Sequence, residues 1–551
     1  MNNLDLISML EKVEKSNFSW DNATVYFVIT DRFLDGDSSN NNSYGRQSDP
    51  EHQNIGTFHG GDLKGLTQKL NSNYFTDLGI NAIWITAPYE QIHGWVEGAN
   101  FSFKHYAYHG YYVLDYTKID ANMGILSDLE TFIDTAHSKG IRVVFDIVMN
   151  HAGYASIKDL SEFNIGVLKS GWENYSLGNY HTYIDYDSTN WVNWWGPQWV
   201  RAGLPGYTQP GGDDYTRCLA YLPDFKTEST DYVNLPVFYT KSGDKSDTNA
   251  TYIPNFTVRK YITKWLTDWV RNYGVDGFRV DTAKHVEMDA WVYLKNEARQ
   301  ALIDWRNANP SKPGAKWTDD FWTVAEVWGH GVNQSNYHTS GAFDSVINFS
   351  YKGSIEGAMG STSSMDNLFS NYANSINSSS SWNVLSYISS HDTGSVFYNG
   401  DDNRQIRAGT VFFLTPGGIQ VFYGDELGRE NGPCGADPDQ GSRSSMNWTK
   451  ENNAIHQHWK IMGQFRNRHI AIGAGSHTKL KDSPYTFKRE KDDDKVVVVI
   501  DASGPTTVNV SGIWDNGTVL RDFYTGNTAT VSGGNVTFTA GSKGVILIEK
   551  P

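Results

Sequence analysis

Eight short runs of apolar and β-branched residues recur between Thr24 and Tyr423, and helical patterns lie between most of them. The runs are Thr24–Thr30, Ile80–Thr86, Ile141–Asn150, Val275–Asp281, Phe321–Trp328, Ser345–Ser350, Asn383–Ser389 and Gly418–Tyr423. The helical segments are Leu63–Leu78, Leu126–Lys139, Val258–Tyr273, Ala290–Asn307 and Arg404–Leu414, and a last one covers about Ala454–Arg468. Alternating strands and helices build a parallel sheet, and eight such repeats close into a barrel. The sequence therefore predicts an α/β fold, a (β/α)8 TIM barrel.

Two parts of the chain depart from this alternation. The third and fourth runs are separated by a stretch, Ala152 to about Asn255, that is rich in Tyr, Trp, Gly and Asp. A structureless loop of that length is not expected in a compact domain, so we predict a small inserted domain. After Ile470, short runs separated by Gly, Asp and Asn are typical of an all-β sandwich. Its expected strands are Val496–Ile500, Thr506–Val510, Asn535–Thr539 and Gly544–Ile548.

The 551 residues are too many for one core, so we expect several domains. Residues 1–151 and 256–470 are expected to form the barrel, residues 152–255 the domain inserted after the third strand, and residues 471–551 the C-terminal β-sandwich. No apolar run reaches the roughly 18 residues of a membrane span, so we expect no membrane partner. Met1–Lys15 shows no apolar core of a signal peptide.

The composition excludes one class of partner and favours another. The formal net charge of −16 argues against nucleic acid, because phosphate binding needs a basic face. Aromatic residues make up 14% of the chain, and flat rings stack on sugars, so the excess fits a carbohydrate-binding protein. A large aromatic core would give the same composition. For Cys218 and Cys434, the two cysteines, unpaired buried thiols are favoured over a single disulfide.

Charged and polar side chains follow four of the apolar runs at the point where each run ends. Arg279 and Asp281 close the fourth run, and a strand has period two, so both side chains point to the same side. Glu326 lies in the fifth run. The third and seventh runs end in Asp146-Ile147-Val148-Met149-Asn150-His151 and Ser389-Ser390-His391-Asp392-Thr393. Singly, each would be read as a polar cap. Because the carboxyl ends of barrel strands share one face, we expect these groups to form one site.

Three acids on one face suit the hydrolysis of glycosidic bonds, which needs one carboxylate and one carboxylic acid. A guanidinium beside Asp281 favours its ionised form, so we expect a low pKa that suits a nucleophile. Glu326 lies between Ala325 and Val327, and apolar surroundings raise a carboxyl pKa and keep a general acid protonated. Asp392 is placed to bind sugar hydroxyls.

These four stretches resemble the four signature regions of the α-amylase superfamily of retaining glycoside hydrolases, glycoside hydrolase family 13. Leu222-Pro223-Asp224-Phe225 resembles a fifth, short region in the inserted domain of that family, in the form typical of α-amylases. The resemblance covers about Ala23 to Trp448, and the β-rich tail matches the C-terminal domain of the family. Five matches in the same order are a specific signal.

The resemblance implies a role for each matched position. Asp281 would be the nucleophile, Glu326 the general acid and then the base, and Asp392 would stabilise and distort the sugar. The implied substrate-binding residues are Arg279, which orients the nucleophile, His151 and His391 on hydroxyls of the cleaved sugar, Lys284 and His285 on the leaving-group side, and His109 with Tyr111 in a His-Gly-Tyr-Tyr motif. Tyr111 would stack on the cleaved sugar, and the alternative for it is a core aromatic.

The resemblance also implies calcium, which takes oxygen ligands. One structural ion is expected between the inserted domain and the barrel, on Asn150, Asp224, the His285 carbonyl and a further ligand from the inserted domain. A second is expected in an N-terminal loop that resembles the calcium loop of cyclodextrin glycosyltransferases and some bacterial α-amylases. Its matching positions are Asp35, Asp37, Asn40, Asn41, Asp62 and the Gly60 carbonyl. The alternative for this loop is a set of polar Asx turns.

One position departs from the usual pattern of the family. Ser390 stands where the family has Asn before its His-Asp pair, and chloride-activated members use that Asn on the anion, so we predict no chloride. Together with Ala325–Val332, the Ser-Ser-His-Asp-Thr form is most similar to periplasmic α-amylases of Gram-negative bacteria.

The implied function is endo-hydrolysis of α-1,4-glucosidic bonds in starch, glycogen and maltodextrins, with retention of configuration. The alternatives are a maltooligosaccharide-forming exo-amylase or a transglycosylase, which share the catalytic residues. A non-catalytic carbohydrate-binding relative is disfavoured, because Asp281, Glu326 and Asp392 are all present. We expect a monomer. Calcium loops favour an extracellular or periplasmic protein, but no export signal is visible, so a cytoplasmic location stays open.

Overall fold

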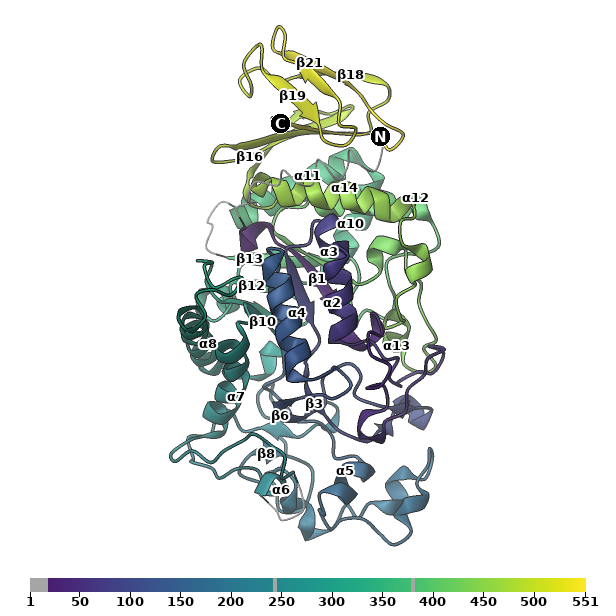
Figure 1. Cartoon of the computed structure of the whole chain (residues 1–551), viewed down its shortest axis with the longest axis vertical. Helices are drawn as coiled ribbons and strands as arrows, with labels where there is room; N and C mark the ends of the chain where they lie inside the picture. Colours follow the sequence, from purple (N-terminus) through teal and green to yellow (C-terminus); the bar gives the residue numbers. More distant parts are fainter. Residues whose placement is uncertain (1–17, 241–244, 378–381) are drawn as a thin grey trace.

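A computed structural model describes residues 18–240, 245–377 and 382–551 of the chain (Figure 1). Within these residues, eight parallel strands close into a barrel in chain order. They are β1 (Thr24–Val28), β2 (Ala82–Ile85), β7 (Arg142–Ile147), β10 (Gly277–Val280), β11 (Trp322–Ala325), β12 (Ser345–Asn348), β13 (Asn383–Tyr387) and β14 (Gly418–Phe422). β14 pairs with β1, with Ile419 opposite Thr24, which closes the ring. The predicted barrel is confirmed, and each strand lies inside a predicted run.

Helices cover the outside of the barrel. They include α2 (Leu63–Asn71), α3 (Tyr74–Asp77), α4 (Leu126–Ser138), α7 (Val258–Tyr273), α8 (Met288–Ala308), α10 (Tyr351–Gly360), α11 (Thr362–Tyr372), α12 (Asp402–Phe413) and α14 (Ala454–Arg468). α7 begins where the Thr257 side chain accepts a hydrogen bond from the Lys260 amide, and it ends at Gly274, whose φ is 78°. The segment predicted as one helix, Leu63–Leu78, is two helices, because Asn73 between them is left-handed with φ 63°.

The long connection after β2 carries two small hairpins. β3 (Tyr89–Gln91) pairs with β6 (Val113–Ile119), and β4 (Val96–Glu97) pairs with β5 (Lys104–His105). The segment between β5 and β6 includes His109 and Tyr111, so these hairpins position two of the predicted sugar-binding residues.

Between β7 and α7 the chain leaves the barrel and forms the inserted region, which has little regular structure. Its elements include α5 (Ile157–Glu162), β8 (Val200–Arg201), β9 (Asp224–Phe225), α6 (Val237–Thr240) and several short 3-10 helices. Aromatic packing joins it to the barrel, since Trp199 stacks on Trp265 of α7 with ring centroids 5.5 Å apart. An insertion after the third strand is thus confirmed, and its boundaries at 152 and 255 stay a prediction.

The C-terminal domain consists of two antiparallel sheets. The strands are β15 (Ser476–Lys481), β16 (Tyr485–Lys491), β17 (Asp494–Ile500), β18 (Pro505–Asn509), β19 (Val519–Asp522), β20 (Thr528–Thr530), β21 (Asn535–Thr539) and β22 (Val545–Glu549). One sheet has the order β15-β16-β17-β22-β19-β20, and β18 pairs with β21. In β17, Val497 and Val499 pack toward the small sheet, whereas Val496 and Val498 join the core shared with the barrel. The all-β sandwich is confirmed.

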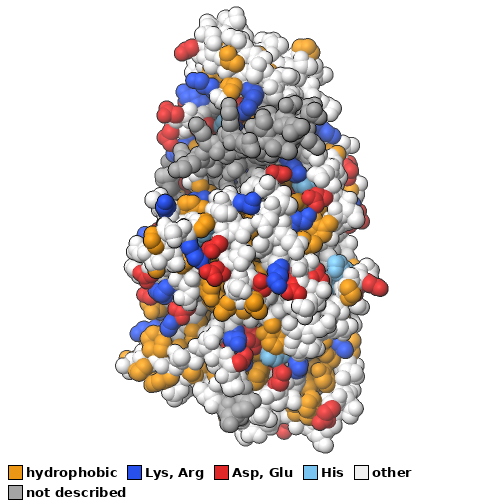
Figure 2. Space-filling model, viewed as in Figure 1, with side chains coloured by type: hydrophobic (Ala, Val, Ile, Leu, Met, Phe, Trp, Pro, Cys, Tyr) orange, Lys and Arg blue, Asp and Glu red, His pale blue; other side chains and the backbone are white. Residues whose placement is uncertain are grey.

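The composition led to expectations about the charged surface, membrane-spanning helices and the two cysteines. Acidic and basic side chains are interspersed on the face seen in Figure 2. None of the helices in the described ranges combines the length and the apolar character needed to cross a membrane. Both thiols are free, but Cys218 is half-buried and Cys434 is exposed, so the expectation that both are buried is wrong.

Candidate active site

Three acids meet on one arginine at the carboxyl ends of β7, β10 and β11. Nη1 of the buried Arg279 lies 2.8 Å from Asp146 Oδ1 and 2.9 Å from Asp281 Oδ1. Nη2 of the same side chain lies 3.1 Å from Glu326 Oε1. The register explains the meeting, because Arg279 stands opposite Asp146 on β7, and Asp281 and Glu326 directly follow the paired ends of β10 and β11. The predicted nucleophile and the predicted acid therefore share one guanidinium.

Asp146 fixes this guanidinium from the β7 side. Its Oδ2 accepts hydrogen bonds from Trp84 Nε1 at 3.0 Å and from the Tyr111 hydroxyl at 2.7 Å. Burial raises the pKa of Asp146 to about 6, although Arg279 favours the ionised form. The sequence placed Asp146 at a strand end without a role, and the structure shows that it orients Arg279.

The expected low pKa of Asp281 is wrong. Burial raises the pKa of Asp281 to about 6 despite Arg279, and the charge of Asp146 adds to the rise. The physical reason is that one guanidinium serves three carboxyl groups. Burial raises the pKa of Glu326 further, to about 7, against Arg279 and with the charges of Asp281 and Asp392. The rise at Glu326 suits a general acid, which has to carry a proton before the glycosidic bond breaks.

The turn that follows the β10 strand holds Glu326 in place. The Thr282 amide donates to Glu326 Oε2 at 2.8 Å, and the Ala283 amide donates to the Glu326 carbonyl at 3.0 Å. Thr282 takes the left-handed conformation with φ 48°, which is strained for a β-branched residue. This turn leads into the 3-10 helix η9 (Ala283–His285). It directs one amide at the carboxyl group of Glu326 and one at its backbone carbonyl.

Asp392 is held by a residue that the sequence reasoning missed. Arg443, directly after α13 (Pro438–Ser442), places Nη2 2.6 Å from Asp392 Oδ1 and donates from Nε to the His391 carbonyl at 2.9 Å. His391 Nε2 lies 3.2 Å from Asp392 Oδ2. Burial lowers the pKa of His391 to about 3. Against burial, the interactions with His391 and then with Arg443 lower the pKa of Asp392.

Aromatic and imidazole rings line the same face. The ring of the half-buried Tyr111 stacks with those of His109 and His391 at centroid distances of 5.5 and 5.4 Å. The Tyr111 hydroxyl lies 2.9 Å from His391 Nε2. Across the described ranges, Nε2 of His109 and Nε2 of His151 are buried without a hydrogen-bond partner. Each imidazole thus keeps one ring nitrogen that is not used in a hydrogen bond within the described residues.

Lys284 and His285, on η9, are both bonded to the inserted region. Lys284 Nζ lies 3.0 Å from Asp214 Oδ2, and His285 Nδ1 lies 2.8 Å from the Asp214 carbonyl. Asp214 was missed, because it belongs to an irregular segment without a periodic pattern.

Two of the positions predicted for the first calcium ion, Asn150 and Asp224, lie where β7 meets β9. His151 and Asp224 form a β-bridge there, and Asn150 Oδ1 is buried with no hydrogen-bond partner in the part of the chain that the structure describes. Asp224 Oδ2 lies 2.9 Å from Arg201 Nη1. Burial nevertheless raises the pKa of Asp224 to about 7, and the nearby acid Glu228 contributes. A free amide oxygen close to Asp224 and Glu228, two acids that share the single guanidinium of Arg201, fits an oxygen-ligated cation.

The N-terminal loop brings together most of the second predicted ligand set. Asn41 Nδ2 donates to Asp35 Oδ2 at 2.7 Å, and Asn40 Nδ2 donates to Asp62 Oδ2 at 3.2 Å. Each amide therefore leaves its oxygen free, and both Oδ1 atoms are buried with no partner among residues 18–240, 245–377 and 382–551. Two orphaned amide oxygens beside two acids fit calcium better than Asx turns alone do.

Two further positions of that set behave differently. A Cβ built on Gly60, whose φ is 96°, would lie 2.7 Å from the Asn41 side chain, so only glycine lets this backbone approach the loop. Asp37 instead pairs with Lys64, with Nζ 2.5 Å from Oδ2. The structure thus brings Gly60 to the ligand cluster and pairs Asp37 with a lysine.

His93, Asp159 and Glu162 also bring possible metal-ligand atoms within 4.8 Å of one another. Their geometry is that of an ion-pair cluster. His93 Nδ1 lies 2.7 Å from Glu162 Oε2, and Nε2 lies 2.9 Å from Glu90 Oε1. Although burial opposes it, these carboxylates raise the pKa of His93 to about 9. The imidazolium therefore uses both ring N–H groups and occupies the centre of the cluster itself.

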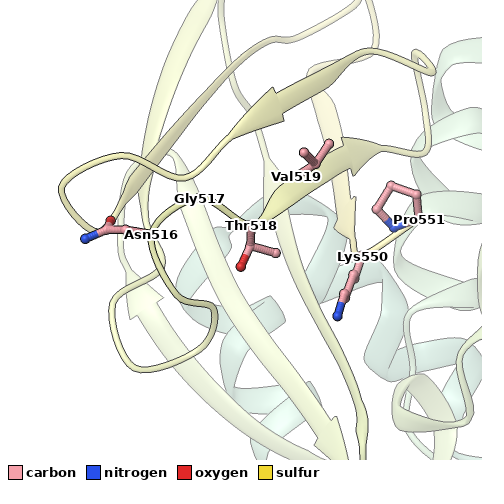
Figure 3. Close-up of a pocket in the computed structure, with 6 residues that line it drawn as sticks. All are labelled: Asn516, Gly517, Thr518, Val519, Lys550 and Pro551. Carbon is pink, nitrogen blue, oxygen red and sulfur yellow. The ribbon is translucent and has the colours of Figure 1, made fainter.

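A separate open hollow of about 570 Å³ lies in the C-terminal domain (Figure 3). It is lined by Asn516, Gly517, Thr518, Val519, Lys550 and Pro551. This lining includes no acidic side chain, imidazole or aromatic ring, so it does not offer the groups that glycosidic chemistry needs.

A (β/α)8 barrel with two buried carboxyl groups beside one guanidinium at its catalytic face is an arrangement that glycoside hydrolases use. A family model described as "Alpha amylase, catalytic domain" matches residues 27–204 and 221–482. The chain belongs to the alpha-amylase family.

Individual relatives agree with this assignment. The periplasmic alpha-amylase of Escherichia coli (strain K12) is 49% identical over 523 residues, which cover 90% of this chain and 75% of that protein. The cyclomaltodextrin glucanotransferase of Paenibacillus macerans is 29% identical over 505 residues, covering 90% of this chain and 62% of that protein. The crystal structure of the alpha-amylase from Geobacillus thermoleovorans, complexed with acarbose, has a TM-score of 0.64 at 20% identity and covers 97% of this chain and 99% of that chain. This last likeness concerns the fold.

Proposed function

We propose that this chain is an endo-acting α-amylase that hydrolyses α-1,4-glucosidic bonds in starch, glycogen and maltodextrins with retention of configuration. The observation that carries the proposal is the shared guanidinium of Arg279, which binds Asp281 at 2.9 Å and Glu326 at 3.1 Å. The raised pKa of Glu326 supports its role as the proton donor, and the Arg279 guanidinium favours the ionised form of Asp281 that a double displacement requires.

In the first step, a carboxylate oxygen of Asp281 attacks the anomeric carbon, and Glu326 transfers its proton to the departing glycosidic oxygen. This forms a bond between sugar and Asp281 and breaks the glycosidic bond. In the second step, Glu326, now a carboxylate, takes a proton from water, which displaces Asp281 and restores both groups. Two inversions give net retention. The carboxyl groups are expected about 5–5.5 Å apart, as in retaining enzymes.

The residues around this pair would bind the sugar that is cleaved. His109 and His151 each have a buried, unpartnered Nε2 within the described residues, and such an atom suits a sugar hydroxyl. Tyr111 is anchored through its hydroxyl, which leaves its ring as the stacking platform. Asp392, held ionised by Arg443, would bind and distort the sugar, together with His391.

Calcium would be structural in this protein. Asn150 and Asp224, with the His285 carbonyl, would hold one ion between the inserted region and β7. Asp35, Asn40, Asn41, Asp62 and the Gly60 carbonyl would hold a second, to which Asp37 would contribute only by leaving Lys64. When bound, each ion would neutralise the acids that hold it and stiffen the loops around the active site.

The second candidate is a transglycosylase or a maltooligosaccharide-forming exo-amylase. The observation that supports this second candidate is the 29% identity to a cyclomaltodextrin glucanotransferase. A long maltooligosaccharide blocked at its non-reducing end separates the candidates. Endo-hydrolysis releases shorter products from it, an exo-enzyme leaves it intact, and a transglycosylase also forms chains longer than the substrate.

The similarity to a periplasmic relative supports an extracellular or periplasmic location, and we propose a monomer that acts on α-glucans without a further partner.

Asp281→Asn tests the mechanism directly. Asparagine keeps the shape but cannot form the glycosyl-enzyme, so we expect starch hydrolysis to fall by about 10⁴-fold or more. Asp289→Asn, an exposed position on α8, is the control and should keep full activity. Full hydrolysis by Asp281→Asn would overturn the proposed mechanism.

A further inference from the structure

A tight turn of the inserted region, residues 211–217, lies on the η9 helix that follows the nucleophile. The turn is closed by a hydrogen bond from the Gly211 amide to the Thr216 carbonyl at 2.9 Å. Asp213 Oδ1 accepts from the amides of Tyr215 at 2.9 Å and Thr216 at 3.0 Å, which fixes the turn from inside. Asp214 is therefore presented on a preformed support.

Asp214 binds both successive residues of η9 through different atoms. Its carboxylate Oδ2 lies 3.0 Å from Lys284 Nζ, and its carbonyl lies 2.8 Å from His285 Nδ1. Oδ1 lies 3.2 Å from Arg217 Nη2, within the same turn. The Lys284 side chain is 45% exposed, so it can reach a ligand while its position is restrained by Asp214.

The η9 helix is only one residue away from the acid–base machinery. Thr282, which precedes η9, donates its amide to Glu326 Oε2 at 2.8 Å, and the Trp291 side chain donates to the Ala283 carbonyl at 2.9 Å. The barrel therefore fixes the start of η9. The next two side chains of η9, Lys284 and His285, instead contact Asp214 of the inserted region.

We propose that Asp214 is a positioning residue that sets the strength of sugar binding on the leaving-group side by fixing Lys284 and His285. The proposal rests on the proposed function and on the family resemblance, which implies that these two residues lie on that side. It assigns this part of substrate specificity to the turn at residues 211–217. Substrates with sugars on the leaving-group side should therefore depend on Asp214, and substrates without them should not.

The test compares Asp214→Asn with wild type on two substrates: maltoheptaose, which has leaving-group sugars, and 4-nitrophenyl α-maltotrioside, cleaved at the nitrophenyl group. For a pair of half-exposed side chains, we expect KM for maltoheptaose to rise about threefold, with kcat kept and both constants for the nitrophenyl substrate unchanged. Asp214→Glu keeps the carboxylate and should restore part of the loss. Arg217→Gln removes the other ion pair of Asp214 and should leave both substrates unaffected.

Lys284→Met tests whether Asp214 acts through Lys284. It should reproduce the effect of Asp214→Asn, and the double variant should be no worse than either single one. An unchanged ratio of the two specificity constants in Asp214→Asn, or an equal loss on both substrates, would overturn the inference alone. Absence of cleavage of both substrates by wild type would overturn the proposed function, and this inference with it.

Discussion

The inserted region and the C-terminal domain are attached to opposite ends of the same barrel (Figure 1). The inserted region has few regular elements, whereas the C-terminal domain is built from two sheets. Yet each is joined by a histidine held between two carboxylates. His93 links Glu90, in the connection after β2, to Glu162 of α5, and His469 lies 2.7 Å from Asp494 and 2.6 Å from Glu549 of the C-terminal sheet.

The two attachments differ in what else they contact. The inserted region binds Lys284 through Asp214, and it carries Asp224 to the end of β7. The C-terminal domain binds the barrel through Arg489, which donates to the Leu414 carbonyl, and through Arg407, which pairs with Asp501. The C-terminal domain itself lies at the end of the barrel opposite to the inserted region (Figure 1). Regular structure is therefore a poor guide to function here, and we expect changes in the two regions to separate activity from stability.

The largest effect is expected at Arg489. This side chain is fully buried, and it donates to the carbonyls of Ile472 at 2.6 Å and Leu414 at 3.1 Å and to His477 Nδ1 at 2.9 Å. Arg489→Met leaves these acceptors unpaired, so we expect the free energy of unfolding to fall by about 4 kcal/mol. Chemical denaturation measures the fall.

The same variant tests the separation of roles. Its kcat and KM, measured well below the melting temperature, should equal those of wild type. Lys488→Met, on the same strand with a half-buried side chain, is the control and should change stability little. A lower kcat in folded Arg489→Met would show that the C-terminal domain does influence the active site.

A smaller effect, on pH dependence, is expected at His93. Its pKa is raised from 6.5 to about 9, so the charged imidazole stabilises the folded state fully below pH 6.5. This stabilisation is lost as the pH rises through 9, and it amounts to about 3 kcal/mol. His93→Gln should remove this part of the pH dependence, which denaturant titrations at pH 6 and pH 9 would measure.

His469 provides the matched comparison, because its pKa is also raised by two carboxylates, against burial. His469→Gln should flatten the stability profile in the same direction but keep kcat/KM. His93→Gln should also lower kcat/KM, since it loosens the region that holds Lys284 and Asp224. Equal kcat/KM values in His93→Gln and His469→Gln would contradict the proposal that only the attachment of the inserted region influences activity.

The sequence predicted the parts of this molecule that repeat or that end strands. The eight barrel strands could be found because their runs are apolar on both sides, and Asp281, Glu326 and Asp392 because each lies within or just beyond the end of such a run. β15, Ser476–Lys481, could not be found, because five of its six residues are exposed, Leu480 is its one apolar residue, and the strand carries no alternation. Arg443 and Asp214 act through contacts between distant segments, which local patterns do not encode. The pKa of Asp281 depends on how many acids share Arg279, and only the packing shows that.

The smallest effect is expected from calcium, and it extends the comparison to the loops at the catalytic end. Asn40 and Asn41 each turn an amide nitrogen to an acid and leave a buried oxygen free within the described residues. An ion at about 30 times its Kd would stabilise the folded chain by about 2 kcal/mol, so a chelator should lower the melting temperature by a few degrees. Asn41→Ala removes one of these oxygens and should reduce the calcium-dependent shift.

Asn42→Ala is the neighbouring control, because the Asn42 side chain donates to the Arg46 carbonyl and the Ser48 hydroxyl and lies outside the ligand set. It should keep the full shift. Asn150→Ala should remove a second part of the shift together with some activity, because it loosens the inserted region from β7. A chelator effect that survives in the Asn41→Ala, Asn150→Ala double variant would place calcium elsewhere in the chain. It would also contradict the proposal that calcium stabilises the loops at the catalytic end of the barrel.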